Sequence, residues 1–200
     1  LLSKPCWSQT FCMTFVFEVP AAMVPAPILW ITGLSGVGKS TLAQAVVAAL
    51  RRQSVQPLLL DGDGVRNALE LPEQGRLHEP HLRQMRAWRM ARLARLAAMQ
   101  GVPVVVATIS LLHAVQSWSR AGSAPYAEIL LEADLAVLKQ RKPQVYLCAD
   151  SCIVGVDIVP EFPVRPELVL PQSFDPANTA THCDRVLQVW HTLLASQRVS

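Results

Sequence analysis

A glycine-rich segment near the start of this 200-residue chain narrows the folds open to it: Gly33-Leu34-Ser35-Gly36-Val37-Gly38-Lys39-Ser40. It matches the Walker A pattern of a phosphate-binding loop. An apolar run at 28–32 precedes it, and a stretch at 39–52 with apolar residues at helical spacing follows it. A glycine turn used only for packing would not explain why a lysine and a serine both follow the last glycine. The segment therefore predicts a strand, a loop and a helix arranged to hold nucleotide phosphates.

Each residue type in this loop has a physical task. The glycines let successive backbone N–H groups and the helix N-terminus point at a phosphate. Lys39 would place its charge at the β- and γ-phosphates, and Ser40 would offer a ligand to Mg²⁺. The predicted cofactors are ATP and Mg²⁺. The predicted ATP-binding residues are Gly33, Leu34, Ser35, Gly36, Val37, Gly38, Lys39, Ser40 and Thr41.

The rest of the chain alternates short apolar runs with longer stretches of helical period, as α/β proteins do. Further strands are expected at 58–60, 102–108, around Ile129 and Leu131, and at 168–170. Helices are expected at 82–100 and 184–195, and residues 143–166 are expected to form a long loop because four prolines interrupt them. The prediction is one P-loop NTPase domain over 25–200. Its doubly wound parallel sheet would have about five strands, with helices on both faces.

Residues 1–24 lack an element that this sheet would require. We expect them to be a disordered extension, or to reflect a start assigned too far upstream, since Met13 and Met23 could each open a shorter chain. No apolar run reaches the ~18 residues that a membrane span needs. The five cysteines lack disulfide-framework spacing, and Cys148 and Cys152 have no matching pair for a zinc site. These features favour a reduced, cytoplasmic protein.

Two carboxylates stand at a position suited to catalysis. Asp61-Gly62-Asp63 ends the second predicted strand, at the carboxyl edge where doubly wound sheets bind ligands. Asp61 or Asp63 could orient or deprotonate an acceptor hydroxyl, while the other could hold Mg²⁺ through water. A turn or a helix cap is the alternative explanation.

The loop together with Leu60-Asp61-Gly62-Asp63-Gly64-Val65-Arg66 resembles the adenylyl-sulfate kinases, P-loop kinases that phosphorylate a ribose hydroxyl of adenylyl sulfate. Arg83, Ile109-Ser110 and Gly155-Val156-Asp157 match further family positions, so the resemblance covers residues 28–170. It implies that Lys39, Asp63 and Asp61 are catalytic. It also implies an acceptor pocket of Asp63, Arg66, Arg83, Ser110 and Asp157, to which we add Arg86 at the start of the same helix.

The sequence departs from the family on the acceptor side. Arg86 stands where the family has Asn, Leu111-Leu112-His113 replace a Pro-aromatic-Arg run, and Ile153 replaces an aromatic residue near the lid. The family's Arg-Asp-x-x-Gly-Leu-Tyr lid start is reduced to Arg141-Lys142-Pro143-Gln144-Val145-Tyr146. The run at 115–120 resembles a branch associated with capsule synthesis, one member of which phosphorylates cytidine diphosphoramidate.

Three functions follow from these patterns. Adenylyl sulfate is the leading acceptor, a cytidine-diphosphate-linked acceptor is the second, and a non-catalytic nucleotide-binding regulator is the rival from another class. A switch GTPase is disfavoured because no Asn-Lys-x-Asp occurs. The arginines at 76–95 suit anionic ligands, but Trp88 alone makes a poor stacking platform for nucleic acid. The expected partners are ATP, a nucleotide-like acceptor and, as an open alternative, a second copy of the chain.

Overall fold

The computed structural model describes residues 23–69, 80–146 and 153–197. Five parallel strands form one sheet in the order β2-β3-β1-β4-β5. The strands are β1 (Ile28–Thr32), β2 (Leu58–Asp61), β3 (Val104–Ala107), β4 (Tyr126–Glu132) and β5 (Leu168–Pro171). The longer helices are α1 (Lys39–Arg52), α3 (Pro80–Met99) and α7 (Pro176–Gln197), and the shorter ones are α2 (Gly62–Ala68), α4 (His113–Arg120), α5 (Leu135–Arg141) and α6 (Pro143–Tyr146). The predicted fold class is confirmed.

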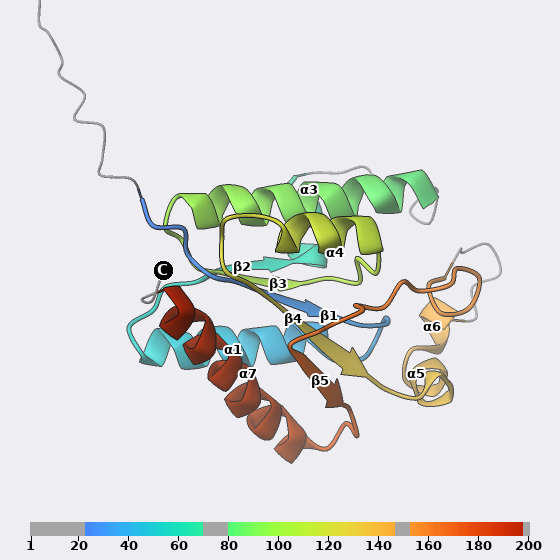
Figure 1. Ribbon diagram of the computed structural model, residues 1–200. Coiled ribbons are helices and arrows are strands. Elements are labelled where there is room, and N and C mark those ends of the chain that lie inside the picture. The colour runs from blue at the N-terminus through green and yellow to red at the C-terminus, as the bar shows by residue number, and fades with distance from the viewer. Residues whose placement is uncertain (1–22, 70–79, 147–152, 198–200) are drawn as a thin grey trace, which may run out of the picture.

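The sheet lies between two helical layers, with α1 and α7 on one face and α3 and α4 on the other (Figure 1). Strand β1 shows why its sequence is wholly apolar. Leu29 and Ile31 belong to the core under α1 and α7, whereas Ile28 and Trp30 belong to the core under α3 and α4. Because successive side chains of a strand point to opposite faces, a central strand covered on both sides needs apolar residues throughout.

The carboxyl ends of the strands gather at one edge of the sheet. The arrowheads in Figure 1 point to the side where α5, α6 and the segment at 153–167 lie. Thr32 at the end of β1 donates its hydroxyl hydrogen bond to the Ile109 carbonyl oxygen, 2.8 Å away, which ties the end of β1 to the chain leaving β3. This edge therefore brings together the loop after β1, the acids after β2 and the polar residues after β3.

Several short helices were not predicted, since stretches of seven or eight residues give too little periodicity. They are α2, α4 and α5, and α6 lies inside the expected loop at 143–166. Pro143 and Pro176 occupy first helical positions, where the missing N–H costs nothing. The closing helix is also longer than the predicted 184–195, because the Asp175 carboxylate caps it by accepting from the Ala177 N–H at 2.9 Å.

Strand β4 contains a buried acid that its apolar pattern concealed. The Glu128 side chain is 3% exposed, and it accepts from Arg120 Nη2 at 3.0 Å and from the Tyr126 hydroxyl at 2.9 Å. Glu167, just before β5, also pairs with Arg120 and accepts from the Glu128 N–H at 2.7 Å. These bonds satisfy the buried carboxylate and connect α4, β4 and the approach to β5.

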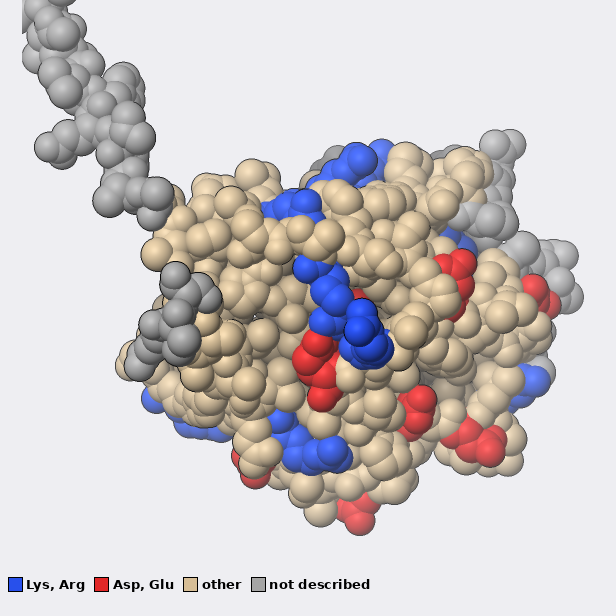
Figure 2. Space-filling model, in the orientation of Figure 1, with Lys and Arg blue, Asp and Glu red and all other residues tan. Residues whose placement is uncertain are grey.

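Some sequence expectations fall outside the described residues: those for residues 1–22, Arg76, Cys148 and Cys152. Within the described ranges, no helix is long and apolar enough to cross a membrane. Trp190 is 2% exposed and Leu187 packs against the same core, as predicted for α7. Lys and Arg side chains gather over α3 in Figure 2, where this helix carries five arginines and no acid.

Candidate active site

The phosphate-binding loop joins β1 to α1 in a conformation that only glycine suits at two positions. Gly33 has φ of +144°, and a Cβ there would collide with the Leu131 carbonyl oxygen. Gly38 has φ of +99° and precedes the first turn of α1, where no side chain of the described residues caps the helix. The N–H groups of that first turn therefore remain available for an anion, and the helix dipole favours negative charge there.

Lys39 is the loop's fixed cation. Its Nζ donates to the Leu34 carbonyl oxygen at 2.8 Å. Burial, followed by repulsion from Lys142, lowers the pKa of Lys39 to about 8, although Asp61 and Asp63 oppose the shift. A bound phosphate would attract both ammonium groups and so relieve the repulsion between Lys39 and Lys142.

Asp61 connects this loop to the end of β2. One of its oxygens, Oδ1, accepts from the Asp63 N–H at 3.0 Å and caps α2, while Oδ2 lies 2.5 Å from Ser40 Oγ. A hydroxyl and a carboxylate at the mouth of a phosphate loop form an oxygen donor set of the kind Mg²⁺ prefers. The Asp61 side chain thus caps α2 and is also placed to bind Mg²⁺. Its geometry fits both a helix cap and a metal ligand.

Asp63 and Arg66 lie one turn apart on α2 and form an ion pair. The Asp63 side chain is 78% exposed and that of Arg66 is 31% exposed. The Asp63 carboxylate is therefore open to a ligand approaching the sheet edge, while Arg66 is partly covered. A carboxylate placed beside a phosphate site can accept a proton from an incoming hydroxyl.

The remaining acceptor-side residues are more spread out. Ser110 shares a 3.1 Å hydrogen bond with Thr108, and a Cβ on Gly62 would lie 3.9 Å from Thr108 Oγ1, so Ser110 stands near the start of α2. Arg83 and Arg86 are half-buried in the first turns of α3. Asp157 points into its own turn, where its carboxylate accepts from the Ile153 N–H at 2.8 Å. The structure therefore groups Ser40, Asp61, Asp63 and Arg66 more tightly than the rest.

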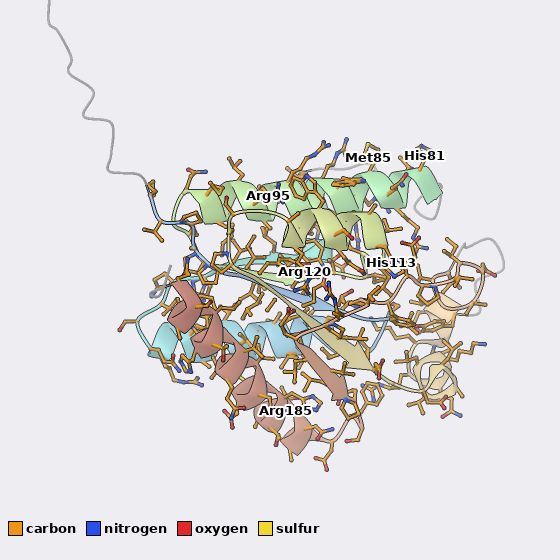
Figure 3. All side chains as sticks on the ribbon, viewed as in Figure 1. His81, Met85, Arg95, His113, Arg120 and Arg185 are labelled. Carbon is orange, nitrogen blue, oxygen red and sulfur yellow. The ribbon has the colours of Figure 1, made fainter. Side chains whose placement is uncertain are left out.

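The structure adds contacts that sequence reasoning missed. The His113 N–H, at the start of α4, donates to Glu161 Oε2 at 2.5 Å, and His113 Nε2 lies 2.9 Å from the Phe162 carbonyl oxygen. Figure 3 labels His113 beside the segment at 153–167. Gln116 Nε2 also donates to the Glu161 carbonyl oxygen at 2.9 Å. His113 is thus a structural residue that fastens this segment to α4, and its 48-residue separation from Glu161 left no local signal.

Ile153, which replaces the expected aromatic residue, also has a structural place. It is 5% exposed and belongs to the core that includes Leu34 and Tyr146. Its side chain offers no stacking surface to a nucleobase. The loss of the aromatic residue therefore removes a contact surface and adds only packing.

Known proteins resemble this chain in sequence over most of its length. The family model described as adenylylsulphate kinase matches residues 26–171. The probable adenylyl-sulfate kinase of Bacillus subtilis is 35% identical over 152 residues, covering 72% of this chain and 75% of that protein. The cytidine diphosphoramidate kinase of Campylobacter jejuni is 34% identical over 140 residues, covering 66% and 78%.

A solved structure has the same fold. The Mycobacterium tuberculosis APS kinase, in complex with AMPPNP and APS, superposes with a TM-score of 0.71 at 26% identity, over 86% of this chain and 98% of the other. The family model covers well over half of the chain, and the resemblance drawn from the sequence is confirmed. The chain belongs to the adenylyl-sulfate kinase family, a family of ATP-binding phosphotransferases.

Proposed function

We propose that this chain is a Mg²⁺- and ATP-dependent kinase that transfers the γ-phosphoryl group to a ribose hydroxyl of adenylyl sulfate. The observation that carries the proposal is the contact between the loop and the acids after β2, where Ser40 Oγ lies 2.5 Å from Asp61 Oδ2. Asp61 also accepts from the Asp63 N–H, so donor-binding and acceptor-side residues meet at one edge of the sheet. The family match over 26–171 supports the same reaction. We also propose that the enzyme is cytoplasmic, where ATP is available.

On the donor side, the N–H groups of the loop and the first turn of α1 bind the phosphates. Lys39 supplies a point charge, and Ser40 with Asp61 would hold Mg²⁺. The metal, when bound, neutralises phosphate charge during transfer. Phosphoryl transfer needs positioning and charge neutralisation more than covalent chemistry by the protein, so these fixed groups supply most of what the reaction requires.

On the acceptor side, Asp63 orients the hydroxyl and accepts its proton, because its carboxylate is exposed at the site. Arg66, Arg83 and Arg86 provide guanidinium groups that suit phosphate or sulfate oxygens. Ser110 contributes a hydroxyl at the end of β3. Asp157 shapes the turn at 153–158 through its bond to Ile153 and acts on the acceptor only indirectly.

A cytidine-diphosphate-linked acceptor is the second candidate, and a specific observation favours it. The cytidine diphosphoramidate kinase is as similar to this chain, at 34% identity, as the adenylyl-sulfate kinases are at 35%. Arg86 adds a cation, and buried Ile153 gives an adenine ring nothing to stack on. Both changes suit a more anionic acceptor that depends less on adenine.

An acceptor panel tests the proposal. Adenylyl sulfate, cytidine-diphosphate-linked compounds and water alone are offered with Mg-ATP while ADP is measured, and kcat/KM is compared. Efficient, saturable turnover of adenylyl sulfate supports the first candidate. A higher kcat/KM for a cytidine-linked acceptor, reduced toward that of adenylyl sulfate in Arg86→Asn, replaces it with the second. ATP binding without turnover of any acceptor would favour the non-catalytic regulator.

A further inference from the structure

Lys142, at the junction of α5 and α6, is a cation to which the proposed reaction assigns no role. Its N–H donates to the Leu138 carbonyl oxygen at 3.0 Å, and its own carbonyl accepts from Val145 and Tyr146 at 2.9 and 3.2 Å. Both backbone polar groups of Lys142 are therefore satisfied. The residue joins two helical turns at a defined position.

This junction is fastened directly to the phosphate-binding loop. The Tyr146 hydroxyl donates to the Ser35 carbonyl oxygen at 2.7 Å, and the Tyr146 side chain is buried in the main core. The aliphatic part of Lys142 lies over Gly36, since a Cβ built there would be 3.3 Å from both Cγ and Cδ of Lys142. The Lys142 stem thus packs against the loop, and a larger residue at position 36 would have to displace it.

The Lys142 charge lies close to the loop. Its ammonium nitrogen is two bonds beyond Cδ, which lies against Gly36. Lys39 belongs to the same loop, where its Nζ donates to the Leu34 carbonyl oxygen. The two ammonium groups therefore approach the loop from different elements, Lys39 from α1 and Lys142 from the end of α5. Without an anion between them they repel each other, and a bound phosphate group would attract both.

We propose that Lys142 is a second phosphate-binding cation, which contacts the ATP phosphates from the α5–α6 side of the loop while Lys39 contacts them from α1. The inference rests on the proposed function, because it requires a nucleoside triphosphate at the loop. A lysine suits the task, since its ammonium group is a compact charge on a flexible stem that can follow the phosphates.

The test compares variants that separate charge from packing. Lys142→Met keeps the apolar stem over Gly36 and removes the charge, whereas Lys142→Arg keeps the charge. Lys139→Ala is the matched control, because Lys139 is an exposed lysine on the same helix. Dissociation constants for ATP, and for inorganic tripolyphosphate as a probe without a base, are measured by calorimetry, and thermal denaturation checks that each variant is folded.

We expect Lys142→Met to weaken ATP and tripolyphosphate binding by the same factor, on the order of tenfold for the loss of one charged contact. Lys142→Arg should recover most of that loss, and Lys139→Ala should stay within about twofold of the wild type. In turnover, KM for ATP should rise while kcat changes less, because the contact exists in the ground state.

Wild-type-like binding of both probes by Lys142→Met would overturn the inference, as would an equal loss in Lys142→Arg. A loss for ATP without a loss for tripolyphosphate would also overturn it, since Lys142 would then act on the base. The proposed function fails separately, if the wild-type chain does not bind ATP or if Lys39→Ala leaves binding unchanged.

Discussion

Replacing Arg120 by Met should destabilise the protein through the acid left behind in β4. In the wild type, the Glu128 side chain is 3% exposed and Arg120 neutralises it at 3.0 Å. Removing one partner of a buried ion pair costs about 3–5 kcal/mol, because the remaining charge has neither water nor a counter-charge. Arg120 itself is 35% exposed, so water can enter its place, and we expect the lower end, about 3 kcal/mol.

The expected loss appears as a lower melting temperature. For domains of 150–250 residues, 1 kcal/mol corresponds to roughly 2–4 °C, so Arg120→Met should melt about 6–12 °C below the wild type at pH 8. Arg120→Met/Glu128→Gln should recover part of the difference, because it removes the uncompensated charge. Arg165→Met is the matched control, since the Arg165 side chain is exposed, and it should change the melting temperature little.

The pH dependence follows from the Glu167 carboxyl group. Burial alone would raise the pKa of Glu167, but hydrogen bonds from Arg120 and from the Glu128 N–H outweigh it and lower the pKa. Stability from Glu167 is therefore present above its ordinary pKa and lost in acid. In Arg120→Met, Glu167 would lose the Arg120 hydrogen bond that helps to lower its pKa, so the variant has less of this stability to lose in acid.

The difference between the wild type and Arg120→Met should thus shrink as the pH falls below the ordinary pKa of Glu167, as measured by calorimetry at each pH. A penalty below about 1 kcal/mol, or one that does not depend on pH, would refute the reasoning, because it would mean that the pair behaves like a solvated surface ion pair.

Three further predictions concern the site and the N-terminus. Lys39→Ala should abolish turnover with every acceptor, because the phosphates lose their fixed counter-charge, and near-normal ADP formation would remove the ATP site from this loop. Asp61→Asn keeps an oxygen that can cap α2 but loses the charge, so the melting temperature should change little. The Mg²⁺ concentration for half-maximal activity should rise about tenfold, and an unchanged Mg²⁺ titration would exclude Asp61 from the metal site. A chain beginning at Met23 should bind ATP and melt like the full chain. It keeps the hydrogen bond from Gln197 to the Pro25 carbonyl oxygen and the one from the Ala26 N–H to the Ala98 carbonyl oxygen. A melting temperature several degrees lower would show that residues 1–22 contribute packing.

The sequence predicted those parts of the fold that carry a strong local pattern. Strands β1 and β3 are buried on both faces, so their continuous apolar runs are visible without the structure. Helix α1 occupies the predicted range of 39–52. Its pattern was visible because Leu42, Val46 and Leu50 repeat on one face, and all three are buried. Short helices such as α4 lacked that signal, since eight residues span little more than two turns.

The same division holds for the candidate site. Lys39, Ser40 and Asp61 were recognised because each belongs to a short motif at a strand end. Contacts made across the fold were not recognised. Tyr146 hydrogen-bonds to Ser35, which is 111 positions earlier in the sequence. Gln172 Nε2 lies 3.4 Å from the carbonyl oxygen of Val37, which is 135 positions earlier. Such pairs depend on how helices and strands pack, and no local spacing in the sequence reports that packing.

Transfer of label from [γ-³²P]ATP to adenylyl sulfate tests the central proposal most directly. With the purified full chain and Mg²⁺, the label should move to the adenylyl sulfate product in equal amount to the ADP formed, and Lys39→Ala should stop both. Label appearing only as inorganic phosphate, or no label leaving ATP under conditions in which ATP is bound, would contradict the assignment of this chain as an adenylyl-sulfate kinase.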